Sequence, residues 1–81
     1  MMGIADAIRE RFNELLTERN LTINALSNLA GVTQSTANDF LKGVSSNIGI
    51  ITLKKLIDGL DMTITEFFDT ELFRNLEQEI K

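Results

Sequence analysis

Polar side chains gather in one short part of this 81-residue chain, at residues 21–43 (LTINALSNLAGVTQSTANDFLKG). Two short helices joined by a turn at Gly31 are expected there, because apolar residues recur at fixed offsets on both sides of that glycine. The same spacing leaves one side of the second helix free and polar. That side carries Gln34, Ser35, Asn38, Asp39 and Lys42. Amides and hydroxyls both donate and accept hydrogen bonds, so this side is suited to recognising another polar surface.

Catalysis has little support in the composition. The chain has no histidine and no cysteine, which removes the commonest general base, the commonest metal ligand and the thiol nucleophile. Ser35, Ser45 and Ser46 therefore have no histidine to activate them, and no group of carboxylates has the spacing of metal ligands. We expect a protein without enzymatic activity, bound metal or cofactor.

The elements that must position the polar side chains are all predicted to be helices. Apolar residues recur every three or four positions, which is the period of a helix with one buried face. The predicted helices cover residues 4–19, 22–29, 33–42, 49–60 and 65–80, and the last one pauses near residues 69 and 70. The length allows one domain, and the apolar fraction of 43% is that of a globular protein.

Capping residues define where the two central helices begin and end. Thr22 and Thr33 are good N-caps for the second and third helices, because a threonine hydroxyl accepts a hydrogen bond from the exposed backbone of the first turn. Gly31 stops the second helix by adopting a positive φ angle, and Gly43 closes the third. The chain has no proline, so glycine, asparagine and these caps must supply every break.

The formal charge of −4 is unevenly distributed along the chain. Residues 19–57 hold four cations against Asp39 alone, whereas the segments before and after them are acidic. The middle of the chain is therefore a weakly basic island, and few contacts with an anionic partner are expected from it. The start of the chain lacks the features of a signal peptide and no stretch is apolar enough for a membrane span, so we expect a cytoplasmic protein.

The segment LTINALSNLAGVTQSTANDFLKG, followed by NIGIITLKKLIDGLDMTITEFF at residues 47–68, resembles the helix-turn-helix of the Xre/Cro family. That family includes the phage repressor and Cro proteins, and the resemblance spans about residues 15–68. It implies an all-α, compact five-helix domain whose third helix enters the major groove of double-stranded DNA, usually as a homodimer on a two-fold operator.

The resemblance also implies roles for individual residues. The positions that match the family's base-reading residues are Gln34, Ser35, Asn38 and Asp39. The positions expected to contact phosphate are Thr22, Thr33, Thr36, Lys42 and Asn47. Amides such as Gln34 and Asn38 can bind adenine through two hydrogen bonds, and Asp39 can accept one from the amino group of cytosine. An ion pair of Asp39 with Lys42 is the competing interpretation of that aspartate.

Three positions depart from the family's pattern. Ile23 stands where the family usually has a glutamine that contacts phosphate, Ala37 replaces a larger aliphatic residue, and Ile48 replaces a common proline. The phosphate contact that this glutamine makes in the family is therefore not expected from Ile23, whereas the contact expected from Thr22 is unaffected.

The expected domain organisation is a helix-turn-helix domain at residues 1–68 and a helical C-terminal extension at residues 69–81. An apolar stripe in the extension consists of Leu72, Phe73, Leu76 and Ile80. We expect this stripe to form a homodimer contact, because a small core gains most from a shared one. The alternative is that the extension folds back on its own domain.

The predicted function is a sequence-specific DNA-binding transcriptional regulator, more specifically a repressor. The alternative is an antitoxin-like or antirepressor protein of the same fold that acts mainly through a protein partner, which the acidic residues near both ends support. A purely structural helical module is a further alternative.

Overall fold

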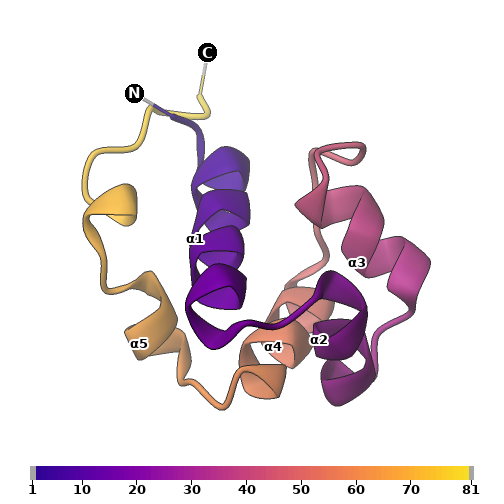
Figure 1. The fold of residues 1–81 in the computed structure, drawn as a ribbon. Coiled ribbons are helices and arrows are strands. Elements are labelled where there is room, and N and C mark those ends of the chain that lie inside the picture. Colours follow the sequence, from indigo (N-terminus) through magenta and orange to yellow (C-terminus); the bar gives the residue numbers. More distant parts are fainter. Residues whose placement is uncertain (1, 81) are drawn as a thin grey trace.

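Five α-helices and one short 3-10 helix make up the protein in this computed structural model, which describes residues 2–80 (Figure 1). Their bounds are α1 Ile4–Arg19, α2 Ile23–Ala30, α3 Gln34–Leu41, α4 Ile50–Gly59, α5 Ile64–Phe68 and the 3-10 helix η1 Glu71–Phe73. The expected all-α, five-helix architecture is confirmed. The first four helices lie within one residue of their predicted bounds, since their limits are set by local caps.

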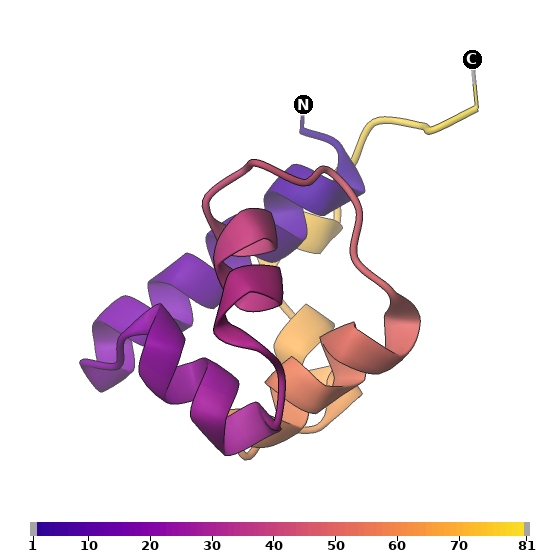
Figure 2. The ribbon, with the colours of Figure 1, turned by 90° about the vertical axis from the view of Figure 1, so that its right-hand side faces the viewer.

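Helix α1 lies between α3 on one side and the segment of α5 and η1 on the other (Figure 1). Seen from the side of α3, α2 and α3 lie in front of α1 (Figure 2). The buried side of α1 consists of Ala7, Ile8, Phe12, Leu15 and Leu16, at the helical spacing seen in the sequence. Asn20 ends the helix in the left-handed region, at φ 55°, and its backbone N–H bonds the last turn. The remaining core side chains come from α2 to α5.

Helices α2 and α4 cross at a point where a side chain would be tightly packed. Gly59, the last residue of α4, lies against α2, and a Cβ atom there would be 3.1 Å from Ala30 Cβ and 3.1 Å from Leu26 Cδ1. Leu26 itself is fully buried. The close approach of the two helices therefore favours glycine here. Backbone conformation does not, since Gly59 is not among the glycines with a positive φ.

Replacing Gly59 by alanine is expected to lower the free energy of unfolding by about 1–2 kcal/mol, since overpacking outweighs the better helix propensity of alanine. Urea unfolding followed by circular dichroism measures this change. Asp58→Ala is the matched control, because Asp58 is in the same helix but has an exposed side chain. Its free energy of unfolding is expected to stay within about 0.5 kcal/mol of that of the parent. Equal midpoints for the two variants would show that the crossing tolerates a methyl group.

Three arginines of α1 bind the carbonyl oxygens at the C-terminal ends of three other helices. Arg9 Nε donates to the Phe40 carbonyl at the end of α3 (2.7 Å), and Arg11 Nε donates to the Phe67 carbonyl at the end of α5 (2.8 Å). Arg19 donates to the carbonyl of Leu60, which follows α4. These carbonyls have no partner within their own helices and carry the negative end of the helix dipole. Helix α1 therefore holds the C-terminal ends of α3, α4 and α5 in place.

Helix α5 begins with a capping box. Thr63 Oγ1 accepts from the backbone of Glu66 (3.1 Å), and the Glu66 carboxylate accepts from the Thr63 N–H (2.9 Å). That backbone hydrogen bond, with the Thr63 side chain as the second cause, holds the pKa of Glu66 below its ordinary value. The stabilisation from this cap is therefore complete above the ordinary pKa and is lost as the pH falls through the lowered one.

The prediction of a helix running on to residue 80 is wrong. Helix α5 ends at Phe68, η1 forms a single turn capped by the Thr70 side chain, and residues 75–80 contain no helix. The physical reason is the packing of aromatic rings: Phe73 lies 4.7 Å from Phe68 and 6.1 Å from Phe67 between ring centroids. A straight helix would carry Phe73 away from the core, whereas the bend at residues 69 and 70 returns it.

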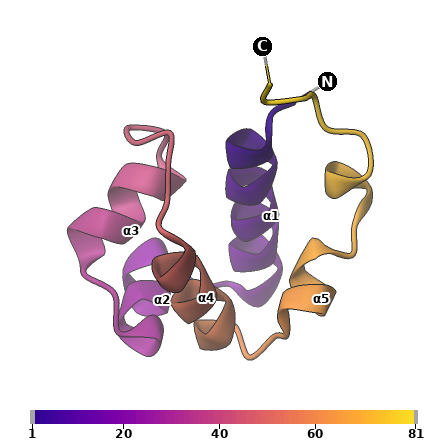
Figure 3. The ribbon, with the colours of Figure 1, turned by 180° about the vertical axis from the view of Figure 1, so that it is seen from behind.

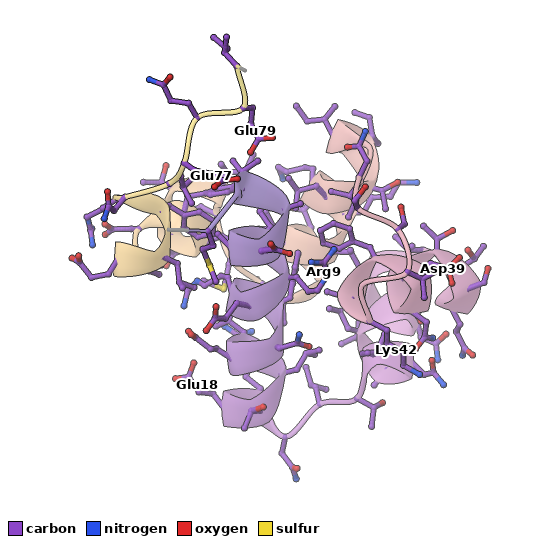
Figure 4. The ribbon with its side chains drawn as sticks, turned by 90° about the horizontal axis from the view of Figure 1, so that it is seen from above. Arg9, Glu18, Asp39, Lys42, Glu77 and Glu79 are labelled. Carbon is purple, nitrogen blue, oxygen red and sulfur yellow. The ribbon has the colours of Figure 1, made fainter. Side chains whose placement is uncertain are left out.

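The C-terminal segment lies along α1 of its own chain, so that the two described ends of the protein are neighbours (Figures 1 and 3). The Glu77 N–H donates to the Met2 carbonyl (3.1 Å), and Figure 4 shows the Glu77 and Glu79 side chains beside the start of α1. Carboxylates at this position interact favourably with the N-terminal end of the helix dipole. No helix among residues 2–80 is long and apolar enough to span a membrane.

Candidate functional site

The outward side of α3 presents the residues expected to read bases. Gln34, Ser35 and Asp39 are exposed, and Asn38 is half-buried at the side of α3 that faces α2. Helix α3 and the C-terminal segment lie on opposite sides of α1, so the segment covers none of these four residues (Figures 1 and 3). The structure thus brings the four predicted base-contact residues together on one side of α3, with three of them exposed.

Helix α3 is held in place at its N-terminal end by its cap. Thr33 Oγ1 accepts from the Thr36 backbone N–H (3.3 Å) and donates to Thr36 Oγ1 (2.8 Å). Before it, Gly31 adopts φ 69°, which a residue with a side chain rarely does, and turns the chain from α2 into α3. The predicted caps Thr22 and Thr33 are both observed, because each acts on a backbone group only three residues away.

Arg9 holds the other end of α3. Its guanidinium donates to the carbonyls of Phe40 (2.7 Å) and Ser45 (3.1 Å), lies 4.9 Å from the Phe40 ring centroid and pairs with Asp6 (2.7 Å). Only 17% of the Arg9 side chain is exposed. Figure 4 shows it between α1 and α3. This positioning residue was not expected from the sequence, since its partners are carbonyl oxygens more than thirty residues away.

Four of the five predicted phosphate contacts line two notches, one on each side of α3. The notch toward α2, of about 220 Å³, is lined by Thr22, Ile23, Asn24, Asn38 and Lys42. The notch toward α4, of about 180 Å³, includes two more predicted residues, Thr36 and Asn47. Thr33, the remaining one, is exposed at the start of α3. The five residues thus surround α3 instead of forming one cluster.

The start of α4 also borders the second notch. Gly49 is its N-cap and supplies no side-chain hydrogen bond, so the first N–H groups of this helix have no cap among the described side chains. Asn47 is held close by, since its Oδ1 accepts from the Ile48 N–H (2.9 Å) and its carbonyl accepts from Ser45 Oγ (2.9 Å). A helix start of this kind is a favourable place for an anion.

Few cations face this site. Arg9, Arg11 and Arg19 bind carbonyls, Lys54 pairs with Asp58, and Arg74 pairs with Asp69 and Glu71. Within residues 2–80, Asp39 and Lys42 form no ion pair, although both are on α3 (Figure 4). Both side chains are exposed, so each is available to a ligand.

A second residue that the sequence did not point to is Asn24, on the first turn of α2. Its Oδ1 accepts from Asn38 Nδ2 (3.0 Å), which connects the two helices of the turn. A bond between side chains fourteen residues apart leaves no periodic signal in a sequence. The position of Asn24, directly after Ile23 at the start of α2, is the only feature that could have suggested it.

Comparisons with known proteins agree with this fold. A family model described as helix-turn-helix matches residues 12–67 of the chain. Among solved structures, the crystal structure of the prophage Lp1 protein 11 is similar, with 34% sequence identity and a TM-score of 0.77. The similarity covers 94% of this chain and 100% of that one. No curated protein matches the chain.

Proposed function

Because this chain belongs to the helix-turn-helix family, whose members are DNA-binding regulators, we propose that it is a sequence-specific transcriptional repressor that inserts α3 into the major groove. The observation that carries the proposal is the exposed polar face of α3, which is capped at one end by Thr33 and held at the other by Arg9. A rigid helix with Gln34, Ser35 and Asp39 exposed can present hydrogen-bonding groups to base edges at a defined register.

The phosphate contacts of the proposal come from the two notches. Lys42 supplies a cation on the side of α2, and the uncapped start of α4 beside Asn47 supplies backbone N–H groups on the other side. Hydroxyls, helix starts and cations of this kind orient a protein on the duplex without reading its sequence. The small number of cations near α3 that have no partner among residues 2–80 predicts modest affinity for one monomer and a shallow dependence on salt.

Selection of bound duplexes from a random pool at low salt tests the proposal. We expect an A/T-containing, two-fold related consensus. Gln34→Ala is expected to weaken binding to that consensus by about 5- to 150-fold and to relax the preference at one base pair, whereas Lys42→Ala weakens binding about evenly for all sequences. Gln78→Ala, an exposed glutamine in the C-terminal segment, is the matched control and should bind as the parent does. The absence of any enriched motif would contradict the proposal.

Two-fold assembly on the operator is part of the proposal, but the apolar residues of the C-terminal segment are mostly in use. Leu72, Phe73 and Leu76 are half-buried against their own chain, and Ile80 is 88% exposed. Truncation after Thr70 distinguishes the two roles. If the unfolding midpoint falls while light scattering gives the same number of chains per particle, residues 71–81 stabilise their own domain. If a dimer becomes a monomer, these residues form the homodimer contact.

A protein partner is the second candidate, and the surface of α1 supports it. Glu10, Glu14 and Glu18 are exposed along this helix and line one open groove together with Arg11. An acidic stripe of this kind suits a basic protein surface. The antitoxin-like or antirepressor role predicts a small toxin gene beside this one and co-purification with its product. Selection of a DNA consensus without any co-purifying protein would favour the repressor.

A further inference from the structure

Both amide hydrogens of Asn38 are already bound within the protein. Asn38 Nδ2 donates to Asn24 Oδ1 (3.0 Å) on α2 and to the Gln34 carbonyl (2.8 Å) one turn earlier on α3. A carboxamide nitrogen carries two hydrogens, so these two bonds use its full donor capacity. The group that Asn38 has left for a ligand is its carbonyl oxygen, Oδ1.

The Asn24 side chain that makes one of these bonds is on a well-anchored turn. The Asn24 carbonyl accepts from Ser27 Oγ (2.8 Å), and Ser27 is fully buried. Two residues earlier, Thr22 caps the start of α2 by accepting from the Ala25 N–H (3.0 Å). The backbone at Asn24 is thus held from both sides, and its carboxamide meets Asn38 in the notch that Lys42 also lines.

We propose that Asn24 is a specificity-determining positioning residue, which holds the Asn38 amide so that Asn38 offers DNA a hydrogen-bond acceptor alone. This inference rests on the proposed function. In the major groove, adenine and cytosine present an amino group, whereas guanine and thymine present acceptors at the corresponding positions. Asn38 therefore selects a base with an amino group, either adenine or cytosine, and does not form the two-bond pair with adenine that its residue type suggests.

Removing the Asn24 oxygen changes this preference in a defined direction. With one hydrogen released, Asn38 can donate to adenine N7 while Oδ1 accepts from adenine N6, which is the two-bond arrangement that cytosine cannot match. The gain of a good two-bond contact corresponds to about 5- to 150-fold in affinity. Asn24→Ala is therefore expected to increase the preference for adenine over cytosine at the base pair that faces Asn38.

The experiment uses the full chain and the consensus selected by the parent protein. Asn38→Ala first identifies the base pair that faces Asn38, because this substitution should remove the sequence preference at that position alone. Binding of the parent, Asn24→Ala and Asn24→Asp is then measured on four duplexes that differ at that pair. Asn24→Asp retains an acceptor oxygen, so it should retain the parent's nearly equal binding of adenine and cytosine while its added charge lowers affinity for all four duplexes alike.

A second readout needs no DNA. In the free protein, the side-chain amide hydrogens of Asn38 should exchange slowly in NMR spectra of the parent and of Asn24→Asp, and faster in Asn24→Ala. The same NMR spectra show whether a variant is folded, because the backbone signals of α2 and α3 keep the parent's positions in a folded variant.

The inference is overturned if the parent already prefers adenine over cytosine by more than about 5-fold at that pair, or if Asn24→Ala leaves the ratio unchanged. It is also overturned if Asn38→Ala changes the preference at no base pair. In each of these cases the parent still selects a consensus, so the proposed function stands. If the parent selects no consensus, the proposed function fails and this inference fails with it.

Discussion

Arg9→Met is expected to lower the free energy of unfolding by about 2–4 kcal/mol and to weaken DNA binding as well, because it releases the C-terminal end of α3. The substitution leaves the carbonyls of Phe40 and Ser45 without the guanidinium that donates to both. Hydrogen bonds from a charged donor at a largely buried position are the stronger class. The Ser45 carbonyl loses the only donor that the described residues give it, whereas the Phe40 carbonyl keeps the Gly43 N–H (3.1 Å). Urea unfolding and duplex binding on the same samples measure the two effects.

Arg74→Met is the matched control for Arg9. The Arg74 side chain is 51% exposed and makes ion pairs with the exposed side chains of Asp69 and Glu71, so its loss is expected to cost no more than about 0.5 kcal/mol. The free energy of unfolding of Arg9→Lys should lie between those of the parent and of Arg9→Met. One ammonium group cannot replace a planar guanidinium that donates to two carbonyls. If Arg9→Met and Arg74→Met unfold at the same urea concentration, Arg9 does not anchor α3.

Phe67→Ala is expected to have the largest effect on the fold, a loss of about 3–5 kcal/mol, because it opens a cavity where three parts of the chain meet. The Phe67 side chain is fully buried, and its ring centroid lies 4.6 Å from that of Phe12 on α1 and 5.0 Å from that of Phe68. The Phe67 backbone carbonyl also accepts a hydrogen bond from Arg11 Nε (2.8 Å). For a domain of this size, such a loss is a large part of the total stability.

Circular dichroism during thermal and urea unfolding measures the loss at Phe67. Phe67→Leu should lose less unfolding free energy than Phe67→Ala, since leucine fills most of the cavity that alanine leaves. Ile64→Ala, in the first turn of the same helix, is the control, because that side chain is 47% exposed and its loss leaves no enclosed cavity. A Phe67→Ala midpoint equal to that of Ile64→Ala would contradict the assignment of this ring to the core.

The exposed polar face of α3 shows how far a structure can be predicted from local sequence patterns. The sequence predicted that Gln34, Ser35 and Asp39 share a face, and the structure has them exposed on α3. What could not be predicted was the state of Asn38. Whether an amide can donate to DNA depends on its neighbours in space, and its neighbour Asn24 is on another helix.

The C-terminal segment shows the opposite limit. Apolar residues at helical spacing predicted a helix through Leu76 and Ile80, but spacing alone does not say what an apolar face packs against. The rings of Phe67, Phe68 and Phe73 gather around one point of the core, and the chain bends to let them do so. Tertiary packing decided this element because a few aromatic contacts outweigh the weak helix preference of a short segment.

By itself, the sequence determined the all-α class, the positions of four helices and the caps at Thr22, Thr33 and Gly31, since each of these depends on groups no more than four residues apart. The tertiary structure alone decided the partners of Arg9, Arg11 and Arg19. Their acceptors are backbone carbonyls, which every residue has, so no residue type marks them in the sequence. Only folding brings those carbonyls to α1.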